Sequence, residues 1–287
     1  MAGTFHQKRV LTIQDVSCLG RCSLTVALPI ISAGGIEAAI LPTAILSTHT
    51  GGFTGFTFRD LTDDIEGIIA HWDSLGLDFD AVYTGYLGSA RQLSIAKKIF
   101  DQYRATGALI LVDPVMADNG KLYPGFPEDF PKGMAGLCAG ADIVVPNLTE
   151  AAFMLDAEYI ESGYDRAYIE GILRRLHGLG AKKAVLTGVS FEEDKIGAAC
   201  FDGETVSYYF TKRYPGAYHG TGDVFSSLLL ASFVRTGDLS FSVQTAVDIT
   251  ADTIRHTIED GVPEDSRHYG PHFEKSLPAF AERLNGR

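Results

Sequence analysis

The stretch Tyr218–Leu228, YHGTGDVFSSL, guides the interpretation of this 287-residue chain. Its two glycines, Gly220 and Gly222, and the carboxylate of Asp223 stand where an irregular loop meets an apolar stripe that predicts a helix from Val224. Backbone N–H groups at a helix start attract anions, and glycine lets a large group approach closely. Asp223 could accept a hydroxyl proton there, as phosphoryl transfer to an alcohol requires. An ordinary loop-to-helix turn explains the stretch about equally well.

Composition and charge narrow the class of protein. With 46% hydrophobic residues and 31 glycines, the chain has the composition of a globular protein. Its formal charge of −12 at pH 7 argues against nucleic acid and anionic membranes as partners, because both bind basic surfaces. No apolar run reaches the ~18 residues of a membrane helix, and Met1–Lys8 has no hydrophobic signal region. We therefore expect a cytoplasmic protein.

The four cysteines, Cys18, Cys22, Cys138 and Cys200, show no paired metal-binding spacing. Cys18 and Cys22 are four residues apart, but no cluster of cysteine and histidine accompanies them. Reduced thiols fit this pattern better than a metal site does.

Strand-like and helix-like segments alternate from end to end. The expected strands are 10–14, 38–41, 81–84, 109–112, 143–145 and 184–187, with a hairpin of 195–201 and 205–210. The main expected helices are 23–33, 60–75, 225–235, 242–258 and 273–284. This alternation predicts an α/β fold with a mainly parallel sheet, helices on both faces and an antiparallel pair near one edge. No linker or repeat divides the chain, so we expect one domain over 1–287.

Polar and glycine-rich residues follow most of the expected strands. They are Gln14 and Asp15, Thr50 to Gly52, Gly85 to Gly88, Asp113, Asp118 to Gly120, Asn147 to Glu150, and Thr187 with Gly188. Ligands of such sheets bind beyond the carboxyl ends of the strands, so one cleft accounts for all of these positions.

Three carboxylates, Asp113, Asp118 and Glu150, could serve Mg²⁺ and a nucleotide in that cleft, since magnesium binds few protein ligands and keeps waters and phosphate oxygens. Each could instead cap a helix or a turn. The chain has neither G-x-x-x-x-G-K-[ST] nor G-x-G-x-x-G after its first strand, which excludes the P-loop and dinucleotide fingerprints. His219 could contact phosphate or substrate, or simply pack, and the same alternatives hold for Tyr86.

Four motifs occur in an order and spacing that we recognise. They are GYLGS at 85–89, VDPVM at 112–116, PNLTE at 146–150 and GTGD at 220–223. With STHT at 47–50, they resemble the pyridoxal kinase branch of the ribokinase-like superfamily, over nearly the whole chain from Ile13 onward. The resemblance implies a three-layer α/β/α sandwich, a homodimer, and a flexible loop over the site at 117–126.

The same resemblance implies ATP-dependent phosphorylation of the 5′-hydroxymethyl group of pyridoxal, pyridoxine or pyridoxamine. Asp223 corresponds to the catalytic base, and Gly220, Thr221 and Gly222 to the anion hole. The positions that serve Mg-ATP, directly or through water, are Asp113, Asp118 and Glu150, and those that contact the nucleotide phosphates are Asn147, Thr187 and Thr221. Contacts to the pyridine ring and its substituents correspond to Thr50 and Tyr86. A need for a monovalent cation stays open.

Two positions depart from the family pattern. Asp15 stands where many members carry a serine that bonds the pyridine ring, and a carboxylate there would favour a protonated ring or a cationic amine. His219 replaces the cysteine of a related bifunctional group that lacks the aspartate, so Asp223 argues against membership of that group. A hydroxymethylpyrimidine kinase of the same fold, or a non-catalytic vitamer-binding protein, are the alternatives.

Overall fold

The computed structural model describes residues 7–287, so the expectation for residues 1–8 falls almost entirely outside it. The strands of the central sheet are β1 (Arg9–Ser17), β2 (Glu37–Leu46), β3 (Phe58–Asp60), β4 (Ala81–Thr84), β5 (Leu109–Val112), β8 (Ile143–Val144), β9 (Lys183–Val189), β10 (Lys195–Phe201) and β11 (Val206–Lys212). They lie side by side in the order β11-β10-β9-β8-β5-β4-β1-β2-β3. A separate short pair consists of β6 (Ala117–Asp118) and β7 (Lys121–Leu122).

The sheet is mainly parallel, as the alternation of strands and helices predicts. Parallel pairing runs from β2 through β1, β4, β5 and β8 to β9. At one edge β10 and β11 continue the sheet in antiparallel fashion, which confirms the predicted edge pair. At the other edge the three-residue strand β3 also pairs antiparallel, with β2, and no separate sequence signal predicts it.

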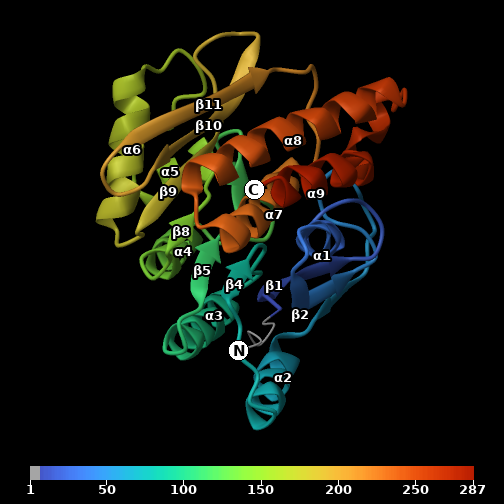
Figure 1. Cartoon of the computed structure of the whole chain (residues 1–287), viewed down its shortest axis with the longest axis vertical. Coiled ribbons are helices and arrows are strands. Elements are labelled where there is room, and N and C mark those ends of the chain that lie inside the picture. Colours follow the sequence, from blue (N-terminus) through green and yellow to red (C-terminus); the bar gives the residue numbers. More distant parts are fainter. Residues whose placement is uncertain (1–6) are drawn as a thin grey trace.

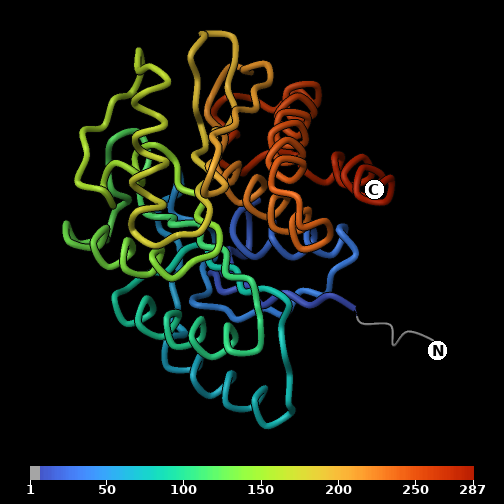
Figure 2. The backbone as a smooth tube through the Cα atoms, turned by 60° about the vertical axis from the view of Figure 1, so that its left-hand side comes forward, coloured from blue at the N-terminus to red at the C-terminus, as the bar shows by residue number. Residues whose placement is uncertain are grey.

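Helices cover both faces of the sheet, which makes three layers (Figure 1). One face carries α2 (Thr62–Ser74), α3 (Ala90–Arg104), α4 (Phe130–Cys138), α5 (Leu148–Met154) and α6 (Arg166–Gly178). The other carries α1 (Leu24–Ala33), α7 (Thr221–Thr236), α8 (Leu239–Glu259) and α9 (Leu277–Asn285). Each face encloses its own apolar core, and α8 also packs along the β10–β11 hairpin (Figure 2).

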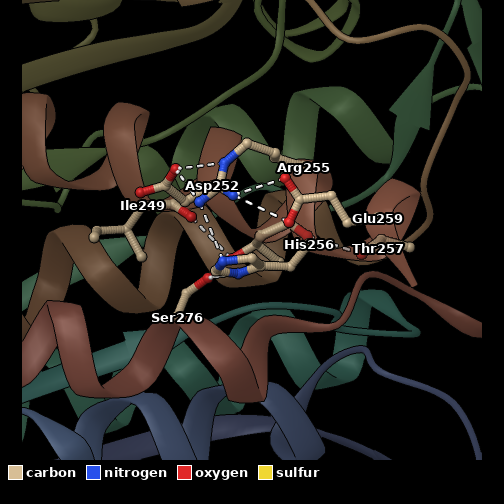
Figure 3. Close-up of polar contacts among 8 residues, drawn as sticks. Ile249, Asp252, Arg255, His256, Thr257, Glu259 and Ser276 are labelled. Atoms are coloured by element: carbon tan, nitrogen blue, oxygen red, sulfur yellow. Dashed lines mark hydrogen bonds and ion pairs between the residues drawn. The ribbon is translucent and has the colours of Figure 1, made fainter.

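The segment after α8 is anchored by polar contacts (Figure 3). It contains two 3₁₀ helices, η1 (Glu264–Tyr269) and η2 (Phe273–Ser276). The hydroxyl of Ser276, which is buried, lies 3.1 Å from Nδ1 of His256 and 3.1 Å from Oγ1 of Thr253, both on α8. The expected single helix 273–284 is therefore divided into η2 and α9, and Pro278 lies in the first turn of α9, where its missing N–H costs nothing.

Two elements that carry site residues, β1 and α7, are longer than the sequence predicts. β1 continues to Ser17 because its pairing with β2 shifts between Gln14 and Val16 and then resumes, a bulge that places Asp15 out of the regular register. α7 begins at Thr221 rather than at 225, so Asp223 lies in its first turn. Between residues 7 and 287 no helix is long and apolar enough to cross a membrane.

Candidate active site

The residues predicted to form the anion hole lie at the start of α7. Gly220 is the N-cap residue, with φ of 82°, and a Cβ there would overlap the carbonyl oxygen of Arg21, so packing requires glycine. Gly222 differs, because nothing beyond its chain neighbours and the backbone of its own helix lies within 4 Å of the place a Cβ would take among the described residues. Since α-helix geometry leaves the first N–H groups outside the hydrogen-bond ladder, the backbone from Thr221 to Asp223 presents donors to this open space.

Asp223 lies in the first turn of α7 and is half-buried. Burial raises the pKa of Asp223 to about 7, a hydrogen bond from the backbone N–H of Ser23 opposes that rise, and the charge of Asp15 adds to it. A carboxylate that titrates near neutral pH is suited to general-base catalysis, because it is partly ionised and still binds a proton well.

Asp15 lies at the bulge in β1, and its exposed fraction is only 4%. Its carboxylate accepts a hydrogen bond from the hydroxyl of Ser17 at 3.1 Å. Burial nevertheless raises the pKa of Asp15. The pKa of Tyr86 is also raised, by burial and then by the charge of Asp15. The structure thus places Asp15 within electrostatic reach of both Tyr86 and Asp223.

Thr50 is exposed in the loop after β2, and histidines hold that loop near the anion hole. Nδ1 of His49 accepts from the N–H of Gly51 at 3.1 Å, so its Nε2 carries the proton and donates to the carbonyl of His268 at 2.6 Å. The rings of His49 and His219 are 5.4 Å apart, and burial lowers the pKa of both. His219 therefore packs against the loop that carries Thr50.

Asp113 and Glu150 form a buried acidic pair at the ends of β5 and β8. Asp113 accepts a 2.7 Å hydrogen bond from Ser226 on α7, and burial raises the pKa of Asp113 to about 7. The pKa of Glu150 is raised by burial and by the charge of Asp113. Glu150 also accepts from the N–H of Asn147 at 2.9 Å and of Met116 at 3.1 Å.

The capping roles considered for these residues are present in the structure. Asn147 and Glu150 form a capping box at the start of α5, and the Asn147 side chain also donates to the carbonyl of Ala117. Thr187 lies beside Asn147 through a parallel bridge. Asp118 is exposed and accepts from the backbone and side chain of Asn119 in the turn between β6 and β7.

A metal ion would need ligands from outside the protein here. Within residues 7–287, no group of three or more histidine, cysteine, aspartate or glutamate side chains is placed to hold a metal ion. A nearby cation would, however, relieve the electrostatic repulsion between Asp113 and Glu150. The site therefore fits Mg²⁺ that takes most of its ligands from water and phosphate.

Sequence reasoning missed Ser226, whose hydroxyl bonds the carboxylate of Asp113, and Ser23, which opposes the rise in the pKa of Asp223. Ser23 directly precedes an apolar helical run, the usual place of an N-cap, and that signal predicts capping rather than contact with Asp223. Ser226 follows Asp223 by three residues, so helical spacing could have placed it near the site.

Residues 28–267 match the family model described as phosphomethylpyrimidine kinase. The chain belongs to this family. It is 28% identical over 270 residues to a pyridoxal kinase of Dictyostelium discoideum, which covers 88% of this chain and 87% of the relative. The structure is similar to that of Lactobacillus plantarum pyridoxal kinase, with a TM-score of 0.87 and 33% identity over 96% of this chain and 97% of that one.

A Bacteroides thetaiotaomicron protein, provisionally named phosphomethylpyrimidine kinase and crystallised with pyridoxal, is also similar. Its TM-score is 0.89, and it is 36% identical over 96% of both chains. The resemblance to pyridoxal kinases and the three-layer α/β architecture are thereby confirmed.

Proposed function

We propose that this family member transfers a phosphoryl group from ATP to the 5′-hydroxymethyl group of a vitamin B6 vitamer. The observation that carries the proposal is the carboxylate of Asp223, with a pKa of about 7, beside the open space at Gly222. The pyridoxal kinases among its relatives, and the pyridoxal in the Bacteroides thetaiotaomicron crystal, support a vitamer as the acceptor.

In this reaction Asp223 takes the proton of the vitamer hydroxyl as its oxygen bonds to the γ-phosphorus. The bond from that phosphorus to the β,γ-bridging oxygen breaks, and ADP leaves. The amides of Gly220, Thr221 and Gly222 stabilise the charge on the transferred group, and one such donor is commonly worth roughly 3 kcal/mol. When bound, Mg²⁺ would neutralise phosphate charge, held by Asp113, Asp118 and Glu150 directly or through water.

The remaining site residues divide between the two substrates. On the nucleotide side, Asn147 and Thr187 are proposed to contact phosphate. On the vitamer side, Thr50 and Tyr86 are proposed to contact the ring, and Asp15 to pair with a protonated ring nitrogen or with the amine of pyridoxamine. Tyr86 also packs against Phe126, with ring centroids 5.5 Å apart, which supports 117–126 as the segment that covers the site.

We also propose a cytoplasmic homodimer built from one kinase domain over 1–287. All four cysteines are free, which suits a reducing compartment. Large apolar side chains are exposed on neighbouring strands at one sheet edge, Ile40 and Ile45 on β2 and Phe58 on β3. Sedimentation of the purified protein would test the dimer, with an Ile45→Glu variant expected to shift it to monomer.

The test of the activity is ADP release with Mg-ATP and, separately, pyridoxal, pyridoxine, pyridoxamine and hydroxymethylpyrimidine. Turnover of a vitamer that falls by about 10²–10⁴ in Asp223→Asn is expected. Turnover of the pyrimidine alone would keep the mechanism and favour the second candidate, which the description of the family model supports. ATP and vitamer binding without turnover on any of the four would indicate a binding protein.

A further inference from the structure

The hairpin of residues 116–123 stands apart from the central sheet. Its strands β6 and β7 form a two-stranded sheet of their own, and the N–H of Tyr123 donates to the carbonyl of Met116 at 2.8 Å. Asn119 and Gly120 make the turn, with φ of 49° and 72°, the positive values that a type I′ turn requires. A two-stranded hairpin alone is marginally stable at best, so this one depends on contacts with the rest of the chain.

The start of α5 supplies such contacts through three side chains. Asn147 and Glu150, which form the capping box, also bond the backbone at the base of the hairpin, at residues 116 and 117. Thr149, which lies between them in the sequence, accepts a hydrogen bond from the N–H of Gly120 at 3.0 Å. One short motif therefore holds the hairpin from its base to its turn.

Thr149 differs from the other two residues in what it is free to do. Asn147 and Glu150 are proposed to contact phosphate and Mg²⁺, so these ligands would compete with the hairpin for their side chains. Thr149 is only 2% exposed, and its hydroxyl bonds the turn. The ring of Tyr159 also packs on the turn, since a Cβ added to Gly120 would lie 3.0 Å from two of its atoms. Thr149 can thus hold the hairpin while nucleotide is bound.

The hairpin carries Asp118, the exposed member of the three carboxylates proposed to serve Mg²⁺. Asp118 directly precedes the turn and lies opposite Lys121 in the pairing of β6 with β7. It has no place in the central sheet, so its distance from Asp113 and Glu150 depends on how the hairpin is held against α5.

We propose that Thr149 is a positioning residue, which holds the hairpin against α5 through the N–H of Gly120 and so keeps Asp118 where Mg²⁺ is proposed to bind. The part that concerns Mg²⁺ rests on the proposed function, whereas the docking of the hairpin does not. Loss of the Thr149 hydroxyl should therefore open the hairpin in the absence of any ligand, and raise the Mg²⁺ requirement through Asp118.

The docking is tested without substrates, by the rate at which trypsin cuts the native protein after Lys121. This residue is exposed, and mass spectrometry of the fragment that begins at Leu122 reports this cut alone. Thr149→Val keeps the shape of the side chain but leaves the N–H of Gly120 without its acceptor. We expect cleavage about fivefold faster, as the loss of one hydrogen bond predicts, and a wild-type rate in Thr149→Ser, which keeps the hydroxyl.

The matched control is Thr257→Val. Thr257 is a buried threonine of α8 that also accepts a backbone N–H from another segment, that of His272, at 2.7 Å. This variant should leave cleavage after Lys121 unchanged. Equal cleavage of wild type and Thr149→Val, with Tm values above the digestion temperature, would overturn the docking, and so would the same acceleration in Thr257→Val.

The link to Asp118 is tested by the Mg²⁺ concentration that gives half-maximal vitamer turnover at saturating ATP. We expect it to rise about fivefold in Thr149→Val and at least as much in Asp118→Asn. The double variant should need no more Mg²⁺ than Asp118→Asn, because the hydroxyl acts through that carboxylate. An unchanged requirement in Thr149→Val, or a further fivefold rise in the double variant, would overturn the positioning role.

Failure of the proposed function gives a different result. An Asp118→Asn variant that needs no more Mg²⁺ than wild type would refute the proposed metal role of Asp118, and a wild type without vitamer turnover would refute the kinase activity. In both cases the rates of trypsin cleavage would still decide whether Thr149 holds the hairpin.

Discussion

The turnover number kcat should fall as the pH is lowered through neutrality, because Asp223 must be ionised to accept the hydroxyl proton. Burial, with a smaller contribution from the charge of Asp15, raises the pKa of Asp223 to about 7. With that pKa, the ionised fraction is about 90% at pH 8, about half at pH 7 and about 10% at pH 6. We therefore expect kcat to fall about fivefold from pH 7 to 6 and about tenfold for each further pH unit.

Two neighbouring carboxyl groups refine the expected profile. Asp113 also titrates at a pKa of about 7, so protonation on the nucleotide side should make the acid limb steeper than that of a single group. Replacing Asp15 by asparagine removes a charge that disfavours ionised Asp223. The acid limb of Asp15→Asn should move to lower pH but stay well above 3.8, because burial is the larger cause.

The assay is ADP release at saturating ATP and vitamer from pH 5.5 to 8.5, with the coupling system verified at each pH. Saturation matters, because kcat then reports groups in the complex rather than in the free enzyme. A kcat that is flat down to pH 5.5 would refute the assignment of Asp223 as a base with a raised pKa. An acid limb at the same pH in wild type and Asp15→Asn would refute the coupling between the two carboxylates.

Three further predictions concern the glycines and acids of the site. Gly222→Ala should keep the wild-type Tm, because its Cβ meets no atom beyond its own helix, but kcat should fall at least tenfold. Gly220→Ala should also lower Tm by several degrees, because its Cβ would overlap the carbonyl of Arg21. Equal Tm losses for the two variants in thermal melts would contradict this. Asp223→Asn should raise Tm by several degrees at pH 8, since a folded pKa above the unfolded one makes stability fall as pH rises from about 4 to 7, and the gain should shrink below pH 7 and vanish only below about pH 4. Glu150→Gln keeps one acceptor oxygen for the capping box and loses the bond from Met116, so it should fold with some loss of Tm and need about tenfold more Mg²⁺ for half-maximal rate. An unchanged Mg²⁺ titration would remove Glu150 from the metal site.

The sequence predicts the sheet better than it predicts the polar contacts of the site. The ranges expected for β4, β5 and β10 agree with the structure because short apolar runs bounded by turns are local signals. Asp223 was correctly expected at a helix start, but Thr221 and Gly222 are weak helix formers, so the apolar stripe placed that start too late.

Contacts between distant parts of the chain have no such local signal. Ser23 and Asp223 are 200 positions apart and meet because α1 packs against α7. The bulge at Asp15 likewise depends on pairing with β2. The sequence indicated both a capping and a metal-binding role for Glu150, and the structure shows the first while the second stays a prediction.

The contacts that close the site from the C-terminal side have a consequence for how the protein is made. The carbonyl of His268 accepts a hydrogen bond from His49, and the carbonyl of Tyr269 accepts one from the N–H of Arg21. The Arg21 side chain also forms an ion pair with Glu274 at 2.7 Å. During translation, these partners are made long after the strand and the loops that they contact. A ribosome-bound chain that ends before them should lack these contacts on the vitamer side, so we expect kinase activity to appear only once the chain has been translated beyond Glu274.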